Sequence, residues 1–310
     1  MLELKEIDKP IPKDNQVLVK VAAASVNPLD WHILRGKPFL IRLMGFGILK
    51  PKKTILGADI AGVIEAVGKD VKEFKVGDEV FGGVDLGGFA EYRCASERRF
   101  VLKPANMTFE EAASVPVAAL TALQGLRKGN IQAGHKVLIN GASGGVGTFA
   151  VQIAKSFGAE VTGVCSTRNV ELVHSLGADH VIDYTKEDFT NTEQRYDIII
   201  DNAASRSLFR IKRILNRGGT YVLIGGSSMS LLFQAMLLGP LISVSSGKKI
   251  QSMMASTNKR DLAFMKELIE SGKVKAVIDR RYPFIEIPDA VRYIEEGHAR
   301  GKVVIKVNEA

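Results

Sequence analysis

Four of the seven residues in GASGGVG, positions 141–147, are glycine. The segment follows the strand-like run HKVLIN and precedes the helix-like run FAVQIAKSFG. Glycine at the start of a helix lets an anion approach the free backbone N–H groups, where the helix dipole also favours negative charge. The segment therefore predicts a phosphate-binding loop inside a βαβ unit, and a tight turn that binds nothing is the alternative.

The residues at the end of the next expected strand indicate which dinucleotide fits. A site for NAD usually carries Asp or Glu about 20 residues beyond the glycines, where it binds the ribose 2′-OH. Here the stretch is Cys165-Ser166-Thr167-Arg168-Asn169, which has hydroxyls and a guanidinium but no acid. Because an Arg fork holds a phosphate that a carboxylate would repel, the stretch favours NADPH. The alternative is that Arg168 merely begins a solvated helix.

A regular alternation of strands and helices surrounds this loop. Apolar residues recur at helical spacing from Val146 to Phe157, and Gly158 supplies the stop. Further along, EVTGVCS, HVIDY, YDIIID and GTYVLIGG are typical of strands, and NVELVHSL and SLFRIKRIL are typical of helices. Near-continuous apolar strands that alternate with helices predict a parallel sheet covered on both faces.

The segments on either side of this region differ from it. Residues 1 to about 115 contain short β-branched runs such as QVLVKVAAASVN and ADIAGVIEAVG, which predict a mainly β domain with a helical piece near EEAASVPVAALTALQGL. At the end we expect a helix from about Asn258 to Ser271, a strand IDRRYPF, a helix IPDAVRYIEEG and a strand KVVIKV, which return to the first domain. The predicted domains are 1–115 with 256–310, and 116–255.

Composition narrows the class of protein. The 310 residues are 46% hydrophobic, which suffices for two ordinary domains, and the two cysteines lack the spacing of a disulfide scaffold or a structural zinc lobe. The net charge of +8 comes from scattered basic residues, so no nucleic-acid partner is expected. No signal peptide is visible, and no run approaches the roughly 18 apolar residues of a membrane span, so the predicted location is cytoplasmic.

Motifs over nearly the whole chain resemble the medium-chain dehydrogenase/reductase superfamily. They include SVNPLDWHILRGK, LGADIAGVIEAVG, FKVGDEVFG, GGFAEYRCA, ASVPVAALTALQGL, NGASGGVGTFAVQIAKSFGAEVTGVCST, LGADHVIDY and GHARGKVVIKV, in the family's order. The resemblance implies an α/β protein with a GroES-like β domain for the substrate and a Rossmann doubly wound parallel-sheet domain for the cofactor. The active site would lie in the cleft between them, and a homodimer is expected.

The positions that match the zinc ligands of alcohol dehydrogenases select a branch of this superfamily. The Gly-His-Glu segment of those enzymes corresponds to Gly57-Ala58-Asp59, and their catalytic Cys falls within Ser25-Val26-Asn27-Pro28. Neither stretch supplies a soft ligand, so no metal is expected. The chain thus resembles the zinc-free quinone oxidoreductase and enone reductase branch. Its members transfer hydride from NADPH to a quinone or to the β-carbon of an α,β-unsaturated carbonyl.

The resemblance also assigns cofactor-binding residues. Residues 143–147 would form the phosphate loop, Thr121 would lie near the nicotinamide, and three side chains at 166, 168 and 184 would hold the 2′-phosphate. The full predicted set is Thr121, Ser143, Gly144, Gly145, Val146, Gly147, Ser166, Arg168, Tyr184, Asn202, Gly225 and Gly226. The last three follow the fourth and fifth strands of the expected parallel sheet, at the edge where such sheets bind ligands.

The predicted catalytic residues lie in the first domain. Asn27 is the predicted polar group at the substrate carbonyl, and Asp30 and Trp31 are expected to line or support the pocket. The alternative for Asn27 is a turn residue before Pro28.

Three features depart from the pattern of the resembled family. Phe39 stands near the place where many relatives carry tyrosine, which leaves solvent as the proton donor to the α-carbon. Relatives usually have one more strand before LELKEI, so an unpaired sheet edge is expected in the first domain. The apolar runs 39–53 and 230–244 are expected to wall the cleft for a lipophilic acceptor, with lysines facing a membrane surface, and burial in a core or dimer interface is the alternative.

Two other functions are compatible with the same motifs. A carbonyl or alcohol dehydrogenase would keep the fold, but the missing zinc ligands disfavour it. An NADPH-binding regulatory or nucleic-acid-binding protein with little turnover would also keep the glycine loop, because a fold alone does not prove catalysis.

Overall fold

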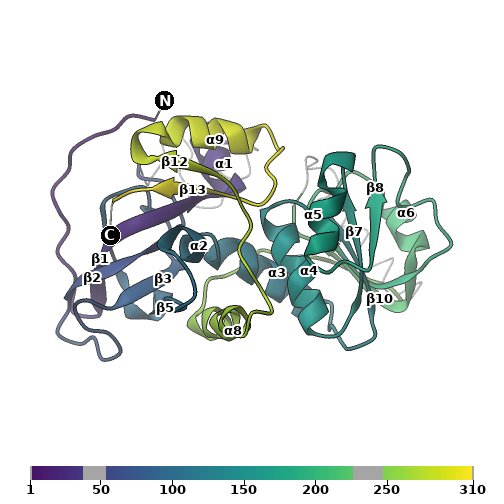
Figure 1. Ribbon diagram of the computed structural model, residues 1–310, viewed down its shortest axis with the longest axis horizontal. Helices are drawn as coiled ribbons and strands as arrows, with labels where there is room; N and C mark the ends of the chain where they lie inside the picture. The colour runs from purple at the N-terminus through teal and green to yellow at the C-terminus, as the bar shows by residue number, and fades with distance from the viewer. Residues whose placement is uncertain (1, 38–53, 226–246, 309–310) are drawn as a thin grey trace. The chain divides into compact units, whose positions relative to one another are not determined.

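The structure is a computed structural model that describes residues 2–37, 54–225 and 247–308 (Figure 1). Its contacts divide the chain into two compact units. Unit 1 comprises Met1–Leu120, Thr257–Ser271 and Ala276–Ala310, and unit 2 comprises Thr121–Ser256 and Gly272–Lys275. The boundary therefore falls inside one helix, α3 (Pro116–Lys128).

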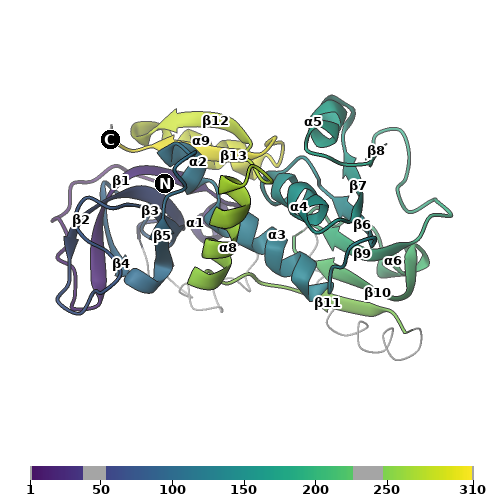
Figure 2. The ribbon, with the colours of Figure 1, turned by 60° about the horizontal axis from the view of Figure 1, so that its bottom comes forward.

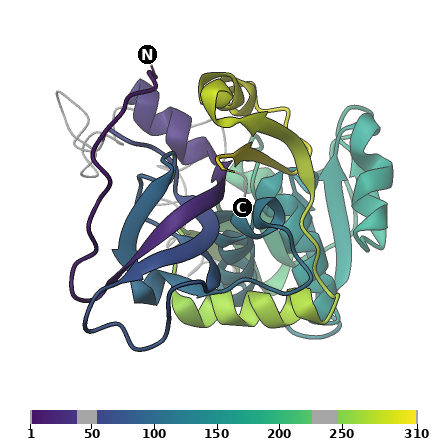
Figure 3. The ribbon, with the colours of Figure 1, turned by 60° about the vertical axis from the view of Figure 1, so that its left-hand side comes forward.

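Unit 1 is built on a 7-stranded sheet, as far as its residues are described, in the order β12-β13-β1-β2-β3-β5 with β4 paired to β1. The pairs are antiparallel except for β12 with β13. The strands are β1 (Gln16–Val26), β2 (Asp59–Val67), β3 (Glu79–Gly83), β4 (Tyr92–Ser96), β5 (Phe100–Leu102), β12 (Ile278–Pro283) and β13 (Lys302–Lys306). Segments from both ends of the chain thus pair side by side, as β1 and β13 do (Figure 3).

The long strand β1 lies at the centre of this sheet and is buried along most of its length. Its pairing with β2 shifts register between Leu18 and Val19 and again between Val21 and Ala23, which bends the strand so that its apolar side chains face one core. That core includes Val17, Val19, Val21, Ile60, Ile64 and Phe100.

Unit 1 also contains helices that pack against its sheet. The helices are α1 (Pro28–Arg35), α2 (Phe109–Ala113), α8 (Lys259–Glu270) and α9 (Ile287–Glu295), with short 3-10 turns η2 (Glu97–Arg99) and η4 (Phe284–Glu286). Helix α9 contacts β12, β13 and α1, whereas α8 contacts β5 at the other end of the strand order (Figure 1).

Unit 2 contains a 6-stranded parallel sheet in the order β11-β10-β9-β6-β7-β8 (Figure 2). The strands are β6 (Lys136–Asn140), β7 (Glu160–Cys165), β8 (His180–Asp183), β9 (Tyr196–Asp201), β10 (Leu215–Leu223) and β11 (Lys249–Ser252). The chain builds the sheet outward from β6 through β7 to β8, then returns to the other side of β6 with β9. The strand order therefore reverses between β6 and β9, and ligands of such sheets bind at this switch point, outside the carboxyl ends of the strands.

Helices lie on both faces of the parallel sheet. They are α3, α4 (Gly145–Ser156), α5 (Val170–Ser175) and α6 (Leu208–Arg213), with the 3-10 turn η3 (Thr167–Asn169). Ile199 of β9 clusters with Leu208 and Ile211 of α6. On the opposite side of the same strand, an added Cβ at Gly129, directly after α3, would meet Ile198 at 2.7 Å, so the end of α3 packs closely there.

The predicted α/β class, with a GroES-like and a Rossmann-type part, is confirmed. The helical piece expected near EEAASVPVAALTALQGL is two helices, because the chain leaves α2 at Ser114 and restarts at Pro116, a residue suited to the first turn of a helix. Helix α1 was not expected from the sequence. Residues 2–13 form no strand.

Some expectations lie outside the described residues. These are Phe39, the apolar runs 39–53 and 230–244, and Gly226. Within the described ranges, no helix has both the length and the apolar character needed to cross a membrane.

Candidate active site

The glycine loop stands between β6 and α4, at the switch point of the parallel sheet. Gly141 has φ of 75°, a left-handed conformation that favours glycine, and an added Cβ at Gly147 would lie 2.0 Å from the carbonyl oxygen of Gly141. The helix therefore packs directly on the loop. At Gly144, the N-cap of α4, an added Cβ would meet only the Gly141 oxygen, at 3.5 Å, so the space beside this residue is open.

This loop has the features that a dinucleotide phosphate needs. The first N–H groups of a helix have no partner within the helix, and the dipole of a 12-residue helix adds positive potential there. Two buried side-chain oxygens, Oδ1 of Asn169 and Oδ1 of Asn202, lack a hydrogen-bond partner among the described residues. Both residues follow carboxyl ends of strands, at the edge where the loop lies. The described residues thus fit a nicotinamide dinucleotide.

Asn202 and Gly225 lie beside the loop, just after the carboxyl ends of β9 and β10. The Asn202 N–H and its Nδ2 donate to the carbonyl oxygen of Asn140 at 3.1 and 3.2 Å. An added Cβ at Gly225 would lie 3.0 Å from the carbonyl oxygen of Asn202. The ends of β6, β9 and β10 therefore meet in one place.

A buried carboxylate fixes these strand ends. Asp201 accepts from Asn140 Nδ2 at 2.7 Å and from the Tyr221 hydroxyl at 2.9 Å. Burial raises the pKa of Asp201 above its ordinary value, although both donors act in the opposite direction. Because its partners come from β6 and β10, Asp201 links three adjacent strands beneath the switch point.

The residues predicted to hold a 2′-phosphate lie at the ends of β7 and β8. Ser166 precedes the turn η3, whose exposed Arg168 extends from its middle position, and the N–H of Tyr184 donates to the carbonyl oxygen of Cys165 at 3.0 Å. Ser143 of the glycine loop and Ser166 both contact the side chain of Asn169. The structure therefore brings the loop and the end of β7 together.

One carboxylate stands close to this group, at the end of β8. The Thr167 hydroxyl donates to Asp183 at 2.5 Å, and Thr185 and Lys186 contact it as well. These contacts, the Thr167 hydroxyl first, lower the pKa of Asp183 to about 2. The carboxylate is thus ionised near neutral pH and engaged by its own neighbours.

Thr121, the remaining predicted cofactor residue, is buried in the second turn of α3. It is the first residue of unit 2. Its assignment to the nicotinamide end stays a prediction.

The predicted catalytic residues of unit 1 belong to a buried polar network centred on Asp59. This carboxylate is 0% exposed and accepts from Ser25 Oγ and Asn27 Nδ2, both at 2.8 Å, while the N–H of Val117 donates to its other oxygen at 2.9 Å. Lys302 Nζ lies 3.5 Å from the Asp59 carboxylate and donates to Asn27 Oδ1 at 2.7 Å. Burial lowers the pKa of Lys302, which the negative charge of Asp59 opposes.

Strand register explains why these residues meet. Ser25 pairs with Asp59 across β1 and β2, and Val26 pairs with Val303 across β1 and β13, which places Lys302 beside Asn27. Asn27 therefore has both ends of its amide engaged, with a third contact of 3.5 Å from Nδ2 to the Ser25 carbonyl oxygen. A role at a substrate carbonyl stays a prediction for Asn27.

Asp30 and Trp31 lie in the first turn of helix α1, which begins directly after Asn27. The buried Asp30 carboxylate accepts the N–H of Asn27 at 2.8 Å and the N–H of Gly57 at 2.9 Å, so it ties the start of the helix to the loop before β2. Burial raises the pKa of Asp30 to about 6. Trp31 is half-buried against the unit 1 core. The centroid of its ring lies 3.6 Å from the centroid of the His32 ring.

The donor set around Asp59 does not fit a zinc ion. It consists of a hydroxyl, an amide and a carboxylate, and an ammonium already lies against the carboxylate. Zinc in this superfamily needs thiolate or imidazole ligands, and a neighbouring cation opposes it. Across the described ranges, no group of three His, Cys, Asp or Glu residues is placed to hold a metal ion.

Local sequence patterns identify Ser25 and Asp59 only as positions without a zinc ligand, and they do not identify Lys302 or Asn169 as site residues. Lys302 lies in the motif GHARGKVVIKV, but its partner Asn27 is 275 residues away, so only the sheet register reveals the contact. Asn169 was part of the stretch examined for cofactor choice. Its link to Ser143 depends on how the two loops fold.

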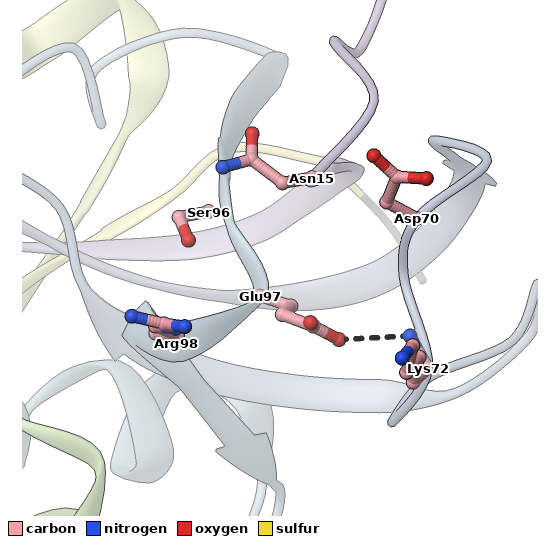
Figure 4. Close-up of a pocket in the computed structure, with 6 residues that line it drawn as sticks. All are labelled: Asn15, Asp70, Lys72, Ser96, Glu97 and Arg98. Carbon is pink, nitrogen blue, oxygen red and sulfur yellow. Dashed lines mark hydrogen bonds between the residues drawn. The ribbon is translucent and has the colours of Figure 1, made fainter.

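A separate cavity of about 480 Å³ lies elsewhere in unit 1 (Figure 4). Its lining residues are Asn15, Asp70, Lys72, Ser96, Glu97 and Arg98. The Glu97 carboxylate there accepts the backbone N–H of Lys72 at 3.1 Å. None of the predicted site residues lines this cavity, so it has no part in the site described above.

We expect Lys302→Met to destabilise unit 1 by about 3–5 kcal/mol, because it leaves the buried Asp59 carboxylate without its cation. Urea unfolding of wild type and variant measures this loss. The matched control is Lys69→Met, which breaks an exposed ion pair with Asp14 and should leave the midpoint unchanged. Adding Asp59→Asn to Lys302→Met should recover part of the loss, and no recovery would contradict the charge-pair explanation.

Asp30 should make unit 1 less stable as the pH rises. Its folded-state pKa of about 6 lies above the ordinary value of 3.8, so the folded chain holds this proton more tightly than the unfolded chain does. The protonated form stabilises the fold below about pH 4, and that contribution is lost as the pH rises through 6, for a change of about 2–3 kcal/mol. Urea unfolding of wild type and Asp30→Asn across this range should show the difference. If the difference in unfolding free energy between the two proteins does not change with pH, the raised pKa of Asp30 is contradicted.

Two family models match the chain. The model described as "Alcohol dehydrogenase GroES-like domain" matches residues 13–105, and the model described as "Zinc-binding dehydrogenase" matches residues 176–305. The first match lies in unit 1, and the second extends from unit 2 into the final strand of unit 1. The second description names a metal that the donor set around Asp59 does not fit.

Several similar proteins are named as quinone or enone reductases. The chain is 36% identical over 306 residues to a 2-methylene-furan-3-one reductase from Solanum lycopersicum, covering 94% of this chain and 72% of that protein. It is also 36% identical over 306 residues to an NADPH-dependent alkenal/one oxidoreductase, chloroplastic, from Arabidopsis thaliana, with the same coverage. Among solved structures, the quinone oxidoreductase from Coxiella burnetii superposes with a TM-score of 0.85 at 31% identity, covering 99% of this chain and 95% of that one. The chain therefore belongs to the quinone oxidoreductase and enone reductase branch of the medium-chain dehydrogenase/reductase superfamily.

Proposed function

We propose that this protein is an NADPH-dependent oxidoreductase that transfers hydride to a quinone or to the β-carbon of an α,β-unsaturated carbonyl. The observation that carries the proposal is the glycine loop at the switch point of unit 2, next to a strand end with hydroxyls and a guanidinium in place of an acid. Two relatives, named 2-methylene-furan-3-one reductase and NADPH-dependent alkenal/one oxidoreductase, support this acceptor class.

Unit 2 is assigned the cofactor. The first-turn N–H groups of α4, from Gly145 to Gly147, would hold the pyrophosphate, and Ser166, Arg168 and Tyr184 the 2′-phosphate. Asn202 and Gly225 would border the cofactor at the switch point, with Thr121 toward the nicotinamide. When bound, the reduced nicotinamide supplies the hydride, and the chain's task is to hold its reactive carbon against the acceptor.

Unit 1 is assigned the acceptor, without zinc. Conjugate reduction spreads negative charge over an enolate, so a hydrogen-bond donor at the carbonyl oxygen can replace a Lewis acid. Asn27 is the proposed donor, with Asp30 and Trp31 in support. Because its Nδ2 already donates to Asp59 at 2.8 Å, the 3.5 Å contact to the Ser25 carbonyl oxygen is the one that a substrate oxygen would replace.

The remaining proposals concern partners and location. A lipophilic acceptor and peripheral membrane contact rest on the apolar runs 39–53 and 230–244, whose structure is not described. The homodimer rests on the resemblance alone, and the cytoplasmic location rests on the two cysteines, which lack the spacing of a disulfide scaffold. No nucleic-acid partner is proposed, because the basic residues are scattered along the chain.

Turnover separates the competing functions. We expect the purified protein to oxidise NADPH steadily when supplied with quinones or enones, and to do so equally well in the presence of a metal chelator. NADPH absorbance measures the rate, with acceptor-free reactions as the baseline. Tight NADPH binding without turnover would favour the regulatory alternative, and reduction of saturated ketones with loss of rate on chelation would favour an alcohol dehydrogenase.

Cofactor choice is tested at Arg168. Losing one charge-assisted contact to a phosphate should cost about 1.5–3 kcal/mol, so Arg168→Ala should weaken NADPH binding roughly ten- to a hundredfold and barely change NADH binding. Titration with each cofactor measures the two dissociation constants. Arg217→Ala is the matched control, since Arg217 is an exposed arginine near the amino end of β10. Equal losses for NADPH and NADH at Arg168→Ala would remove this residue from the 2′-phosphate site.

A further inference from the structure

Asn169 lies between the two loops assigned to the cofactor's phosphates. Its Nδ2 donates to Ser143 Oγ at 2.9 Å and to Ser166 Oγ at 3.3 Å. Ser143 belongs to the glycine loop after β6, and Ser166 follows β7. One amide nitrogen therefore bridges two serine hydroxyls that come from different strands of the parallel sheet.

The bridge determines what each hydroxyl has left to offer. An amide N–H₂ group only donates, so each serine oxygen accepts a hydrogen bond from Asn169 Nδ2 and keeps its own proton. A hydroxyl that is engaged in this way is available to donate, and phosphate oxygens are strong acceptors. Asn169 thus leaves both serine hydroxyls able to donate a hydrogen bond to an anion.

The amide oxygen of Asn169, Oδ1, also indicates that a ligand binds here. Asn169 is 5% exposed, and its Oδ1 has no hydrogen-bond partner in the part of the chain that the structure describes. A buried acceptor without a donor is costly, and such atoms are rare unless a ligand or water satisfies them. The adenosine ribose next to the phosphate carries a hydroxyl donor that can satisfy Oδ1.

We infer that Asn169 is a positioning residue for NADPH, which orients the hydroxyls of Ser143 and Ser166 as a coupled pair of donors to the cofactor's phosphoryl oxygens. The inference rests on the proposed function, because it presupposes a 2′-phosphate at the end of β7. It adds a residue that acts through the two serines and that sets the preference for NADPH over NADH.

The test compares substitutions that differ in polarity. Asn169→Ala removes the bridge, whereas Asn169→Asp keeps the shape but offers only acceptors, so the serine protons turn toward the carboxylate and a negative charge faces the phosphate. The affinity ratio of NADPH to NADH should fall about fivefold in Asn169→Ala, and by more than tenfold in Asn169→Asp. Isothermal titration with each cofactor measures the ratio. Asn216→Ala, which removes a part-buried Asn bonded to Asp197 in the same unit, should leave the ratio unchanged.

A second pair of variants shows whether Asn169 acts through Ser166. In a Ser166→Ala background, Asn169→Ala should change the affinity ratio of NADPH to NADH by less than twofold, because the hydroxyl that it orients toward the 2′-phosphate is gone and Ser143 faces a pyrophosphate that both cofactors carry. Thermal unfolding of the cofactor-free variants provides the structural control, and the unfolding temperature of Asn169→Ala should stay close to that of wild type.

The outcomes distinguish this inference from the proposed function. If wild type prefers NADPH and Ser166→Ala weakens that preference but Asn169→Ala does not, the positioning role is wrong and the proposed function stands. Equal weakening of NADPH and NADH by Asn169→Ala, or an unchanged effect in the Ser166→Ala background, would also overturn it. A wild type without any preference for NADPH would overturn both the inference and the proposed cofactor.

Discussion

An added methyl group on Gly147 would lie 2.0 Å from the carbonyl oxygen of Gly141, and this close packing constrains the glycine loop on which the proposed cofactor site of unit 2 depends. The first turn of α4 therefore packs directly against the residues that follow β6. On the neighbouring strand, an added Cβ at Gly163 would meet Val173 at 2.5 Å and Ala142 at 3.1 Å, so the loop is confined from that direction too. Backbone groups that are held in this way need no reordering when an anion arrives, which lowers the entropic cost of binding.

The Asp59 network of unit 1 and the switch point of unit 2 differ in how their buried polar groups are paired. In unit 1, Asp59, Asn27 and Lys302 satisfy one another, and the network joins the ends of three strands. In unit 2, Asp201 is satisfied in the same manner beneath the switch point, but Asn169 and Asn202 each leave an oxygen without a partner among the described residues. Fully paired groups hold a fold in place, whereas an unpaired acceptor at a ligand-binding edge is ready for a donor from outside.

Local patterns made much of this structure predictable. The glycine loop, the alternating strands and the lack of an acid after β7 are each visible within a short stretch, because they reflect backbone geometry and helical or strand spacing. The roles of Asn27 and Asp30 were harder, since each residue depends on partners from other strands. Lys302 meets Asn27 only through the pairing of β1 with β13, and Asn169 meets Ser143 only through the meeting of two loops. No local sequence pattern predicts either contact.

The pairing of β13 with β1 has a consequence for how the chain matures during translation. Strands β1 to β5 are synthesised first, but their sheet is completed only by residues 278–306, after all the strands of unit 2 have left the ribosome. Long-range pairings of this kind close slowly, and unpaired edges are exposed meanwhile. The ammonium that compensates Asp59 arrives with this last segment. A nascent chain can thus contain all the described strands of unit 2 while unit 1 still lacks β12, β13 and the counterion of Asp59.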